Sequence, residues 1–284
     1  MTAYNRERYI GEAIESVLNS TFRDFELIVV DDCSSDGTVS LARRYESDHR
    51  VRVHVNERNL GDYPNRNRAA TLAIGQYLKY VDSDDYIYPY GLEVMVHTMS
   101  RFPDAGLGLC RPQETTGPHS YQLSPEQAYR EHFLQAGFLA NAPLSTIIRT
   151  GAFWSTGGFS GLRQVGDGEL WLKIAARYPV VKILQQLTWW RTHGQQEVMY
   201  DTLATKRLLS YQVSMAALNS ASCPLDAAAR TEAIHRQRYW YARSVFSTAI
   251  REGSLRPVTK QLRASGMSLT EAAVLTLQKF TMRR

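Results

Sequence analysis

The strongest structural signal in the chain is the run Tyr77-Leu78-Lys79-Tyr80-Val81-Asp82-Ser83-Asp84-Asp85. Its first half, residues 77–81, is typical of a short buried strand, and its second half is a cluster of carboxylates. Open α/β sheets bind ligands at the carboxyl ends of their strands, and closely spaced carboxylates supply the oxygen ligands that hard divalent cations prefer. The run therefore predicts a site for a metal ion and a diphosphate at one edge of a sheet.

Strand and helix patterns alternate on both sides of this run. The other segments that resemble buried strands are 25–30, 51–55, 107–110 and 145–149. The segments with helical spacing of apolar residues upstream of it are 10–18, 41–45 and 67–74. A further helix is predicted to begin at Asp167, with carboxylates in its first turn. Such repeated winding indicates an α/β fold, Rossmann-like, with a mostly parallel sheet and helices on both faces.

The chain divides into two parts by this pattern. We expect an α/β catalytic domain at residues 1–200, followed by a helical C-terminal appendage at residues 201–284. A doubly wound domain normally opens with a strand, whereas residues 1–5 lead directly into the first helix. The first strand is therefore predicted to be truncated.

Composition narrows the classes of function. A chain of 284 residues with 44% hydrophobic residues can bury a large core. The three cysteines have no paired or metal-type spacing, no apolar stretch approaches the roughly 20 residues of a membrane span, and no signal peptide pattern is present. We therefore expect a cytoplasmic protein.

The positive charge of the chain is concentrated near its C-terminus. Residues 227–284 carry 11 Lys and Arg against 3 Glu, which leaves a net charge of −3 on residues 1–226. This negative charge on the predicted catalytic part argues against nucleic-acid binding.

Four motifs, in order and correctly spaced, resemble those of the inverting family 2 glycosyltransferases, which have the nucleotide-sugar-binding GT-A fold. Thr2-Ala3-Tyr4-Asn5 is similar to the end of that family's first strand, its P-T-Y-N element, without the proline. The segment from Glu26 to Thr38 matches the second-strand motif, with Cys33 where glycine is common. Asn59-Leu60-Gly61 with Arg66-Asn67 resembles the segment whose arginine reaches the nucleotide. Asp82-Ser83-Asp84-Asp85 matches the D-x-D element.

The resemblance implies a role for each matching residue. A nucleoside diphosphate sugar is expected as the donor, with Mn²⁺ or Mg²⁺ as the cofactor. Asp84 would ligate the metal directly, and Asp82 would meet the ribose or a metal-bound water. The remaining positions assigned to the nucleotide sugar are Thr2, Tyr4, Asn5, Asp31, Asp32 and Arg66. Within that set, Tyr4 can stack on the base and Asp32 can accept from a ring N–H.

Two later segments extend the resemblance. The acceptor hydroxyl needs a base on the face opposite the diphosphate, because its own pKa lies far above neutral. The family's E-D-x-x-L-W-L element aligns its aspartate with Asp167, which is therefore the predicted general base; Gly166 replaces the usual glutamate, and Glu169 is a weaker substitute. The alternative for Asp167 is a helix-capping role. His193 matches a histidine that contacts the metal or the diphosphate, and the alternative for it is a structural role.

The donor base and sugar, the acceptor and the linkage are not specified by these motifs. The resemblance implies bacterial cell-surface polysaccharide assembly, with a sugar or a lipid-linked sugar as the acceptor. Aromatic and basic residues between 236 and 251 are compatible with peripheral contact with the inner membrane, and equally with a packed appendage or a homodimer contact.

Two alternatives to an active transferase remain from the sequence. One is a non-catalytic or partner-dependent relative, because a truncated first strand would remove one wall of the base pocket. The other is a sugar-nucleotide nucleotidyltransferase, which shares the fold but normally has a Gly-rich basic loop after its first strand, and no such loop is found here. The strings of a dehydrogenase or a P-loop enzyme are also missing from the sequence.

Overall fold

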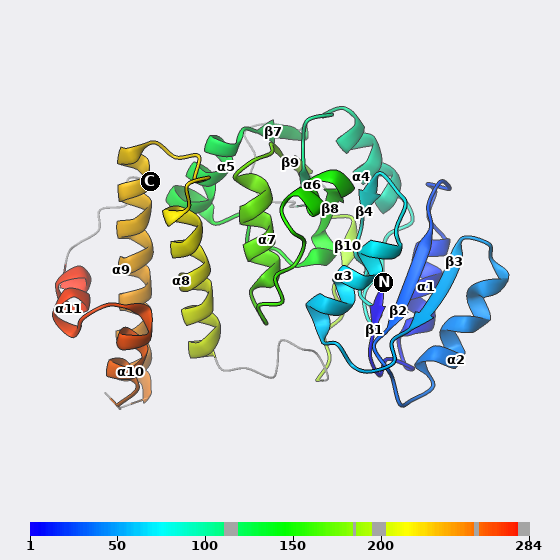
Figure 1. Ribbon diagram of the computed structural model, residues 1–284, viewed down its shortest axis with the longest axis horizontal. Coiled ribbons are helices and arrows are strands. Elements are labelled where there is room, and N and C mark those ends of the chain that lie inside the picture. The colour runs from blue at the N-terminus through cyan, green and yellow to red at the C-terminus, as the bar shows by residue number, and fades with distance from the viewer. Residues whose placement is uncertain (111–118, 184–185, 195–202, 253–255, 278–284) are drawn as a thin grey trace.

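The computed structural model of the protein describes residues 1–110, 119–183, 186–194, 203–252 and 256–277. Figure 1 shows three parts along the longest axis: a small sheet with its helices, a larger sheet in the middle, and a group of helices at the far end. The α/β class followed by a helical C-terminal region is therefore confirmed. The boundary between residues 200 and 201 stays a prediction.

Three parallel strands form the first sheet, in the order β1 (Thr2–Ala3), β2 (Leu27–Asp31) and β3 (Val51–Val55). The first strand has only two residues, and the predicted truncation stays a prediction. Its neighbouring helices are α1 (Ile10–Leu18), α2 (Thr38–Arg43), the 3₁₀ turn η1 (Arg44–Ser47) and α3 (Asp62–Leu72). The helix α1 buries Ile10, Ile14 and Val17, so its apolar stripe faces the core as expected.

The second sheet is mixed rather than mostly parallel. Its order is β4 (Tyr77–Leu78), β8 (Thr146–Arg149), β6 (Leu107–Cys110), β9 (Val180–Ile183) and β7 (Tyr121–Leu123). The pair β6–β9 is parallel, and the other three pairs are antiparallel. The expectation of a mostly parallel sheet thus holds for the first sheet alone, because apolar periodicity locates a strand without giving its direction.

The strand before the acidic cluster is shorter than predicted. Pairing with β8 ends at Leu78, and Tyr80 and Val81 are buried outside the ladder. The Lys79 ammonium donates to the carbonyls of Tyr80 and Leu144. The chain from Lys79 onward therefore leaves the sheet and carries the acidic cluster toward the first sheet.

The remaining elements cover this framework. Between the two sheets, β5 (Tyr86–Ile87) pairs antiparallel with β10 (Thr188–Trp189). The other helices of this region are α4 (Gly91–Ser100), α5 (Pro125–Glu131), the π-helical η2 (His132–Ala136), the 3₁₀ turn η3 (Pro143–Ser145), α6 (Thr150–Ser155) and α7 (Gly166–Ala175). The indole of Trp171 on α7 is fully buried and donates to the Asn141 carbonyl (2.7 Å), which fixes α7 on the larger sheet.

The C-terminal region contains α8 (Leu203–Asn219), α9 (Ala227–Glu252), α10 (Arg256–Ser265) and α11 (Leu269–Leu277). On α9, Tyr239 and Tyr241 are buried, whereas Trp240 is partly exposed. Arg238 pairs with Glu271, and Arg236 donates to the Leu134 carbonyl, so much of the basic and aromatic character of α9 serves packing within the protein. Within the described ranges, we find no helix that is long and apolar enough to cross a membrane.

Candidate active site

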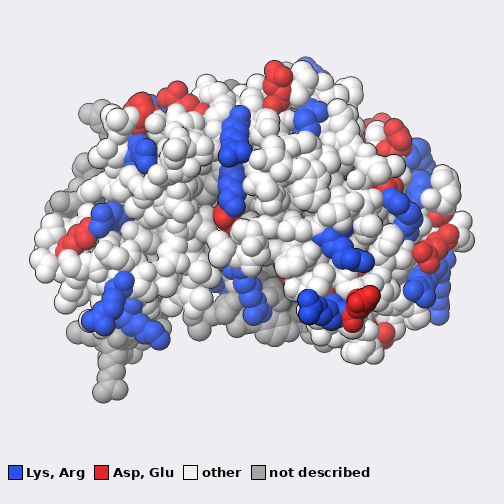
Figure 2. Space-filling view, in the orientation of Figure 1, with Lys and Arg blue, Asp and Glu red and all other residues white. Residues whose placement is uncertain are grey.

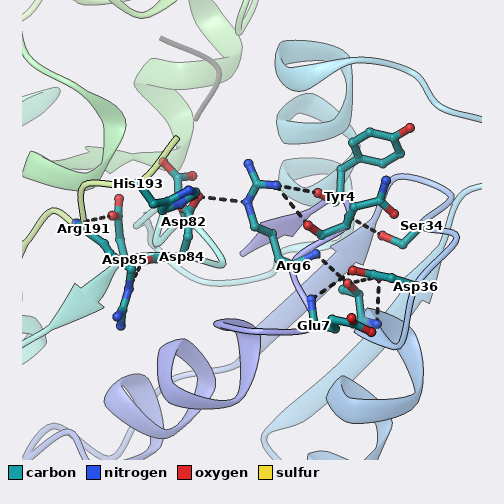
Figure 3. Close-up of polar contacts among 12 residues, drawn as sticks. Tyr4, Arg6, Glu7, Ser34, Asp36, Asp82, Asp84, Asp85, Arg191 and His193 are labelled. Carbon is teal, nitrogen blue, oxygen red and sulfur yellow. Dashed lines mark hydrogen bonds and ion pairs between the residues drawn. The ribbon is translucent and has the colours of Figure 1, made fainter. Parts of the chain in front are cut away.

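A cleft of about 710 Å³ lies where the carboxyl ends of β1 and β2 face the acidic cluster. It is lined by residues from every sequence motif singled out above, including Thr2, Tyr4, Asp32, Arg66 and Asp167. The two sheets are separate, so these segments converge because the chain leaves the second sheet after β4 and carries the acidic cluster to the ends of β1 and β2. Figure 3 shows the polar contacts on the side of the acidic cluster.

Asp32 organises the wall on the side of the first sheet. Its Oδ1 accepts from the Leu60 amide (2.8 Å) and from Asn56 Nδ2 (2.7 Å), and its Oδ2 accepts from the Gly61 amide (2.9 Å). Gly61 has φ 89°, a backbone conformation that favours glycine. Asp32 therefore holds the 59–61 loop in place at the cleft, beside the exposed ring of Tyr4.

Asn5 and Asp31 do not line the cleft. The Asp31 carboxylate accepts from the amide (2.8 Å) and the hydroxyl (2.5 Å) of Ser34, and Asn5 Oδ1 accepts from the Ser35 amide (2.9 Å). Both side chains therefore shape the turn after β2, and their assignment to the nucleotide sugar stays a prediction. In the same turn, Cys33 adopts φ 66°, which explains why glycine is common at that position of the motif.

The buried Arg66 and the partly buried Asp82 form an ion pair in the lining of the cleft. Arg66 Nη1 lies 2.7 Å from Asp82 Oδ1, and Arg66 Nε lies 2.8 Å from Asp62 Oδ1. Burial alone would lower the pKa of Arg66, but the two carboxylates outweigh it and raise that pKa. Burial likewise opposes ionisation of Asp82, and Arg66 lowers its pKa nonetheless. Both side chains therefore remain charged at neutral pH.

Asp84 and His193, which the sequence assigns to the metal, are in contact, and their role as ligands stays a prediction. His193 Nε2 lies 3.0 Å from Asp84 Oδ2, and the ring of Tyr9 stacks on the imidazole with centroids 4.7 Å apart. The same Asp84 oxygen accepts from Arg6 Nε at 2.9 Å (Figure 3). Sequence reasoning missed Arg6, although it directly follows the Thr2-Ala3-Tyr4-Asn5 motif.

Arg191 ties the segment after β10 to the acidic cluster and was also missed. Its amide donates to Asp85 Oδ1 (2.9 Å) and its Nε donates to the Asp84 carbonyl (2.9 Å). Its guanidinium also pairs with Glu12 Oε2 (2.6 Å) on α1. Three segments that are distant in sequence are therefore held together around Asp84.

Asp85 makes stability depend on pH in a direction opposite to that of an ordinary surface aspartate. Burial, with the charges of Asp82 and Asp84, raises the pKa of Asp85 to about 7, against about 3.9 in an unfolded chain. Between these values the folded protein keeps a proton that the unfolded chain has lost, so the contribution of Asp85 to stability falls as the pH rises through this window.

We therefore expect Asp85→Asn to raise Tm by about 3 °C at pH 8 and by only about 1 °C at pH 5. The amide oxygen of Asn can still accept from the Arg191 amide, so the change removes charge rather than the contact. Differential scanning fluorimetry without added metal measures both values, with the exposed Asp104→Asn as the control. An equal shift at both pH values would contradict the assignment.

Asp167 lines the same cleft as Asp32 and lies near the start of α7. Its Oδ1 accepts from the Gly168 amide (2.7 Å), and its own amide donates to Tyr63 Oη (3.2 Å). Val165 is the N-cap of α7 and has no capping side chain, so Asp167 is not the capping residue. Burial raises the pKa of Asp167 above its ordinary value, as suits a group that must accept a proton.

The presence of glycine at position 166 has a steric reason. A Cβ at this position would lie 2.8 Å from the Tyr63 ring, so any larger residue would displace Tyr63. Tyr63 was not singled out from the sequence, yet it supports the amide of Asp167. The glutamate that the family resemblance leads one to expect before Asp167 is therefore incompatible with this packing.

The donor set around Asp84 fits a divalent cation that the substrate would complete. The described ranges contain no cluster of three or more His, Cys, Asp or Glu that could hold a metal alone. Asp84 and His193 supply one carboxylate oxygen and one imidazole nitrogen, which Mn²⁺ accepts. Divalent ions in phosphate-transfer sites are commonly held by one or two protein ligands plus substrate phosphates. Asp82 is engaged by Arg66, so its role as a ligand stays a prediction.

Comparison with known proteins places this arrangement in a family. The family model of glycosyl transferase family 2 matches residues 1–157, more than half of the chain. The chain therefore belongs to glycosyl transferase family 2. TuaG of Bacillus subtilis, named as a teichuronic acid biosynthesis glycosyltransferase, is 42% identical over 84 residues. That match covers 29% of this chain and 33% of TuaG, about a third of the relative's length.

Two solved structures share the fold. TarS residues 1–349 from Staphylococcus aureus, in complex with UDP-GlcNAc, matches with a TM-score of 0.72 at 20% identity and covers 93% of this chain and 77% of that one. The mannosyltransferase PcManGT from Pyrobaculum calidifontis, in complex with GDP-Man and Mn²⁺, matches with a TM-score of 0.65 at 19% identity. The match covers 98% of this chain and 79% of PcManGT. These similarities confirm the predicted GT-A fold.

Proposed function

We propose that this protein transfers a sugar from a nucleoside diphosphate sugar to an acceptor hydroxyl, with inversion at the anomeric carbon and with the help of a divalent cation. The observation that carries the proposal is a single cleft lined by Tyr4, Asp32, Asp84 and Asp167, with His193 in contact with Asp84. A nucleoside, a diphosphate and an acceptor can each meet suitable chemistry there.

The residues divide the work of a direct displacement. Tyr4 and Asp32 bind and orient the base, and Arg66 holds Asp82 toward the ribose. Asp84 and His193 would hold a divalent cation, which would neutralise the charge that grows on the leaving diphosphate. Asp167 accepts the proton of the acceptor hydroxyl while its oxygen forms the bond to the anomeric carbon. The bond from that carbon to the diphosphate breaks, and the nucleoside diphosphate leaves with the electron pair.

The names of two relatives support a biological role for this protein. TuaG is named for teichuronic acid biosynthesis, and TarS is named as a poly(ribitol-phosphate) β-N-acetylglucosaminyltransferase. Both names concern cell-surface polymers, which supports a role in bacterial cell-surface polysaccharide assembly with a sugar or lipid-linked sugar as the acceptor. A cytoplasmic location, at the inner membrane where a lipid-linked acceptor is used, would fit this role.

The distribution of surface charge does not favour contact with a membrane. On the face drawn in Figure 2, Lys and Arg lie dispersed among Asp and Glu rather than in one continuous basic stripe. With Tyr239 and Tyr241 buried on α9, packing accounts for most of the features that suggested a membrane surface. A flotation assay with anionic vesicles tests the contact, and the absence of protein from the floated fraction would exclude it.

We expect wild-type protein with Mn²⁺ to gain about 5 °C in Tm with one class of donor among UDP-, GDP- and dTDP-sugars, at about 100 times its Kd. Asp84→Ala should abolish this gain, because the cation loses its carboxylate ligand. The exposed Asp104→Ala is the matched control and should keep the gain. Slow donor hydrolysis, followed by release of the nucleoside diphosphate, should show the same pattern. No response of the wild type to any donor would favour a non-catalytic relative.

A further inference from the structure

Arg6 lies between the two halves of the candidate active site. It comes from the segment after β1, 78 positions from Asp84, and its Nε donates to Asp84 Oδ2 at 2.9 Å (Figure 3). The ion pair is largely buried, with 18% of the Arg6 side chain and 12% of the Asp84 side chain exposed. Arg6 therefore places a fixed positive charge on the carboxylate that we assign to the metal.

The rest of the Arg6 side chain is anchored by backbone oxygens. Its Nη1 donates to the carbonyls of Tyr4 (3.1 Å) and Asn5 (3.0 Å), and its own amide donates to Thr38 Oγ1 (2.7 Å). The guanidinium is thus held at the border of the cleft, between the residue assigned to the base and the residue assigned to the metal. A diphosphate that joins these two places must pass it.

Arg6 and a cation compete for the same oxygen. Asp84 Oδ2 already takes part in contacts with both Arg6 Nε and His193 Nε2. A cation bound through that oxygen has to replace the hydrogen bond from Arg6, and it also meets the repulsion of a guanidinium a few ångströms away. The displaced guanidinium presents a planar fork of donors, which matches phosphate oxygens.

We propose that Arg6 is an exchangeable counter-ion of Asp84: it neutralises the carboxylate until a divalent cation binds there, and it then donates to the diphosphate of the donor. This role deepens the proposed glycosyl transfer and rests on it. Arg6 would thereby couple the two ligands, because the cation releases the group that the diphosphate uses.

Binding of Mn²⁺ alone tests the competition without any turnover. We expect Arg6→Ala to bind Mn²⁺ about tenfold more tightly than the wild type in the absence of nucleotide, measured as free Mn²⁺ by electron paramagnetic resonance. Arg8→Ala removes the same charge from an exposed neighbouring position and should change this affinity less than twofold. Equal or weaker Mn²⁺ binding by Arg6→Ala would overturn the proposal.

Binding of a nucleoside diphosphate tests the second half. With saturating Mn²⁺, we expect Arg6→Ala to bind UDP or GDP, whichever the wild type prefers, about tenfold more weakly, while Arg8→Ala binds it normally. Unchanged affinity would exclude the contact with the diphosphate. Arg6→Gln, which is uncharged but retains hydrogen-bond donors, serves as the second variant if Arg6→Ala does not fold.

The two proposals fail in different ways. If the wild type binds neither UDP, GDP nor dTDP, the proposed transfer is wrong, while the Mn²⁺ titration still reports on Arg6 and Asp84. If the wild type binds donor and transfers sugar but the Mn²⁺ affinities of wild type and Arg6→Ala coincide, the counter-ion role alone is wrong.

Discussion

Asp167→Asn is expected to lower kcat for sugar transfer about 10³-fold and to leave donor binding within about threefold of the wild type. The amide keeps the shape of the side chain and can still accept from the Gly168 amide, so α7 should begin as before. What it loses is the ability to take a proton from the acceptor hydroxyl. Initial rates with a saturating donor, together with the donor Kd by calorimetry, separate the two effects.

Glu169→Gln is the matched control for this variant, because Glu169 lies in the same first turn of α7. It pairs with Lys173 (2.7 Å) and contacts the Ser160 hydroxyl, both outside the proposed chemistry. We expect its kcat to stay within about threefold of the wild type. If Glu169→Gln lowers kcat as much as Asp167→Asn does, the assignment of Asp167 as the general base is wrong.

The pH dependence of the wild type gives a second measure of Asp167. Burial raises its pKa, and the base has to be ionised to act, so kcat/KM should fall on the acid side at a higher pH than an ordinary aspartate would give. In Asp167→Asn this acid limb should be missing from the residual activity. A limb that persists unchanged in the variant would belong to another group.

The sequence motifs located the cleft because they mark strand ends. Asp32 follows β2, and Asp82 and Asp84 follow the apolar run that contains β4, so the rule that ligands bind at carboxyl ends of strands marked both walls of the cleft. It did not predict their convergence, because β2 and β4 belong to different sheets. The same local patterns predicted β3 at Val51–Val55 and β6 at Leu107–Cys110. Strand direction in the second sheet was not predictable in this way, because it depends on which neighbours the chain finds after long connections.

The residues that were missed act through contacts between distant segments. Arg6 meets Asp84 across 78 positions, and Arg191 meets Asp85 across 106. Arg6 lies just outside the Thr2-Ala3-Tyr4-Asn5 motif, and Arg191 lies in the same aromatic-Arg-x-His segment as His193, but the sequence assigned a role to neither arginine. Tyr63 was missed for the same reason, since its contact with Gly166 arises only when α3 and α7 pack together. Local sequence patterns thus predicted which segments line the site, whereas the ion pairs and hydrogen bonds between those segments depend on tertiary packing.

Arg66→Met is expected to lower the free energy of unfolding by about 3 kcal/mol at pH 7.5. The new side chain keeps most of the volume but leaves the shielded Oδ1 of Asp82, whose side chain is 24% exposed, without its partner at 2.7 Å, while Asp62 is 34% exposed and can be solvated. Urea denaturation measures the loss. Arg68→Met is the matched control, because Arg68 lies on the exposed face of the same helix α3, and it should cost less than about 0.5 kcal/mol.

The sign of the pH dependence distinguishes a lost ion pair from lost packing. In the wild type, Arg66 holds the pKa of Asp82 below its usual range, so this contribution is present above about pH 4 and is lost as the pH falls through the folded pKa. In Arg66→Met, the arginine no longer offsets the effect of burial, so the pKa of Asp82 rises and its carboxylate can take up a proton. The loss of unfolding free energy relative to the wild type should therefore become smaller toward pH 4.5. Adding Asp82→Asn to Arg66→Met should restore part of the stability at pH 7.5, since no buried charge is then left unpaired. A deficit that stays constant with pH, and that Asp82→Asn does not relieve, would show that Arg66 stabilises the floor of the cleft through packing alone.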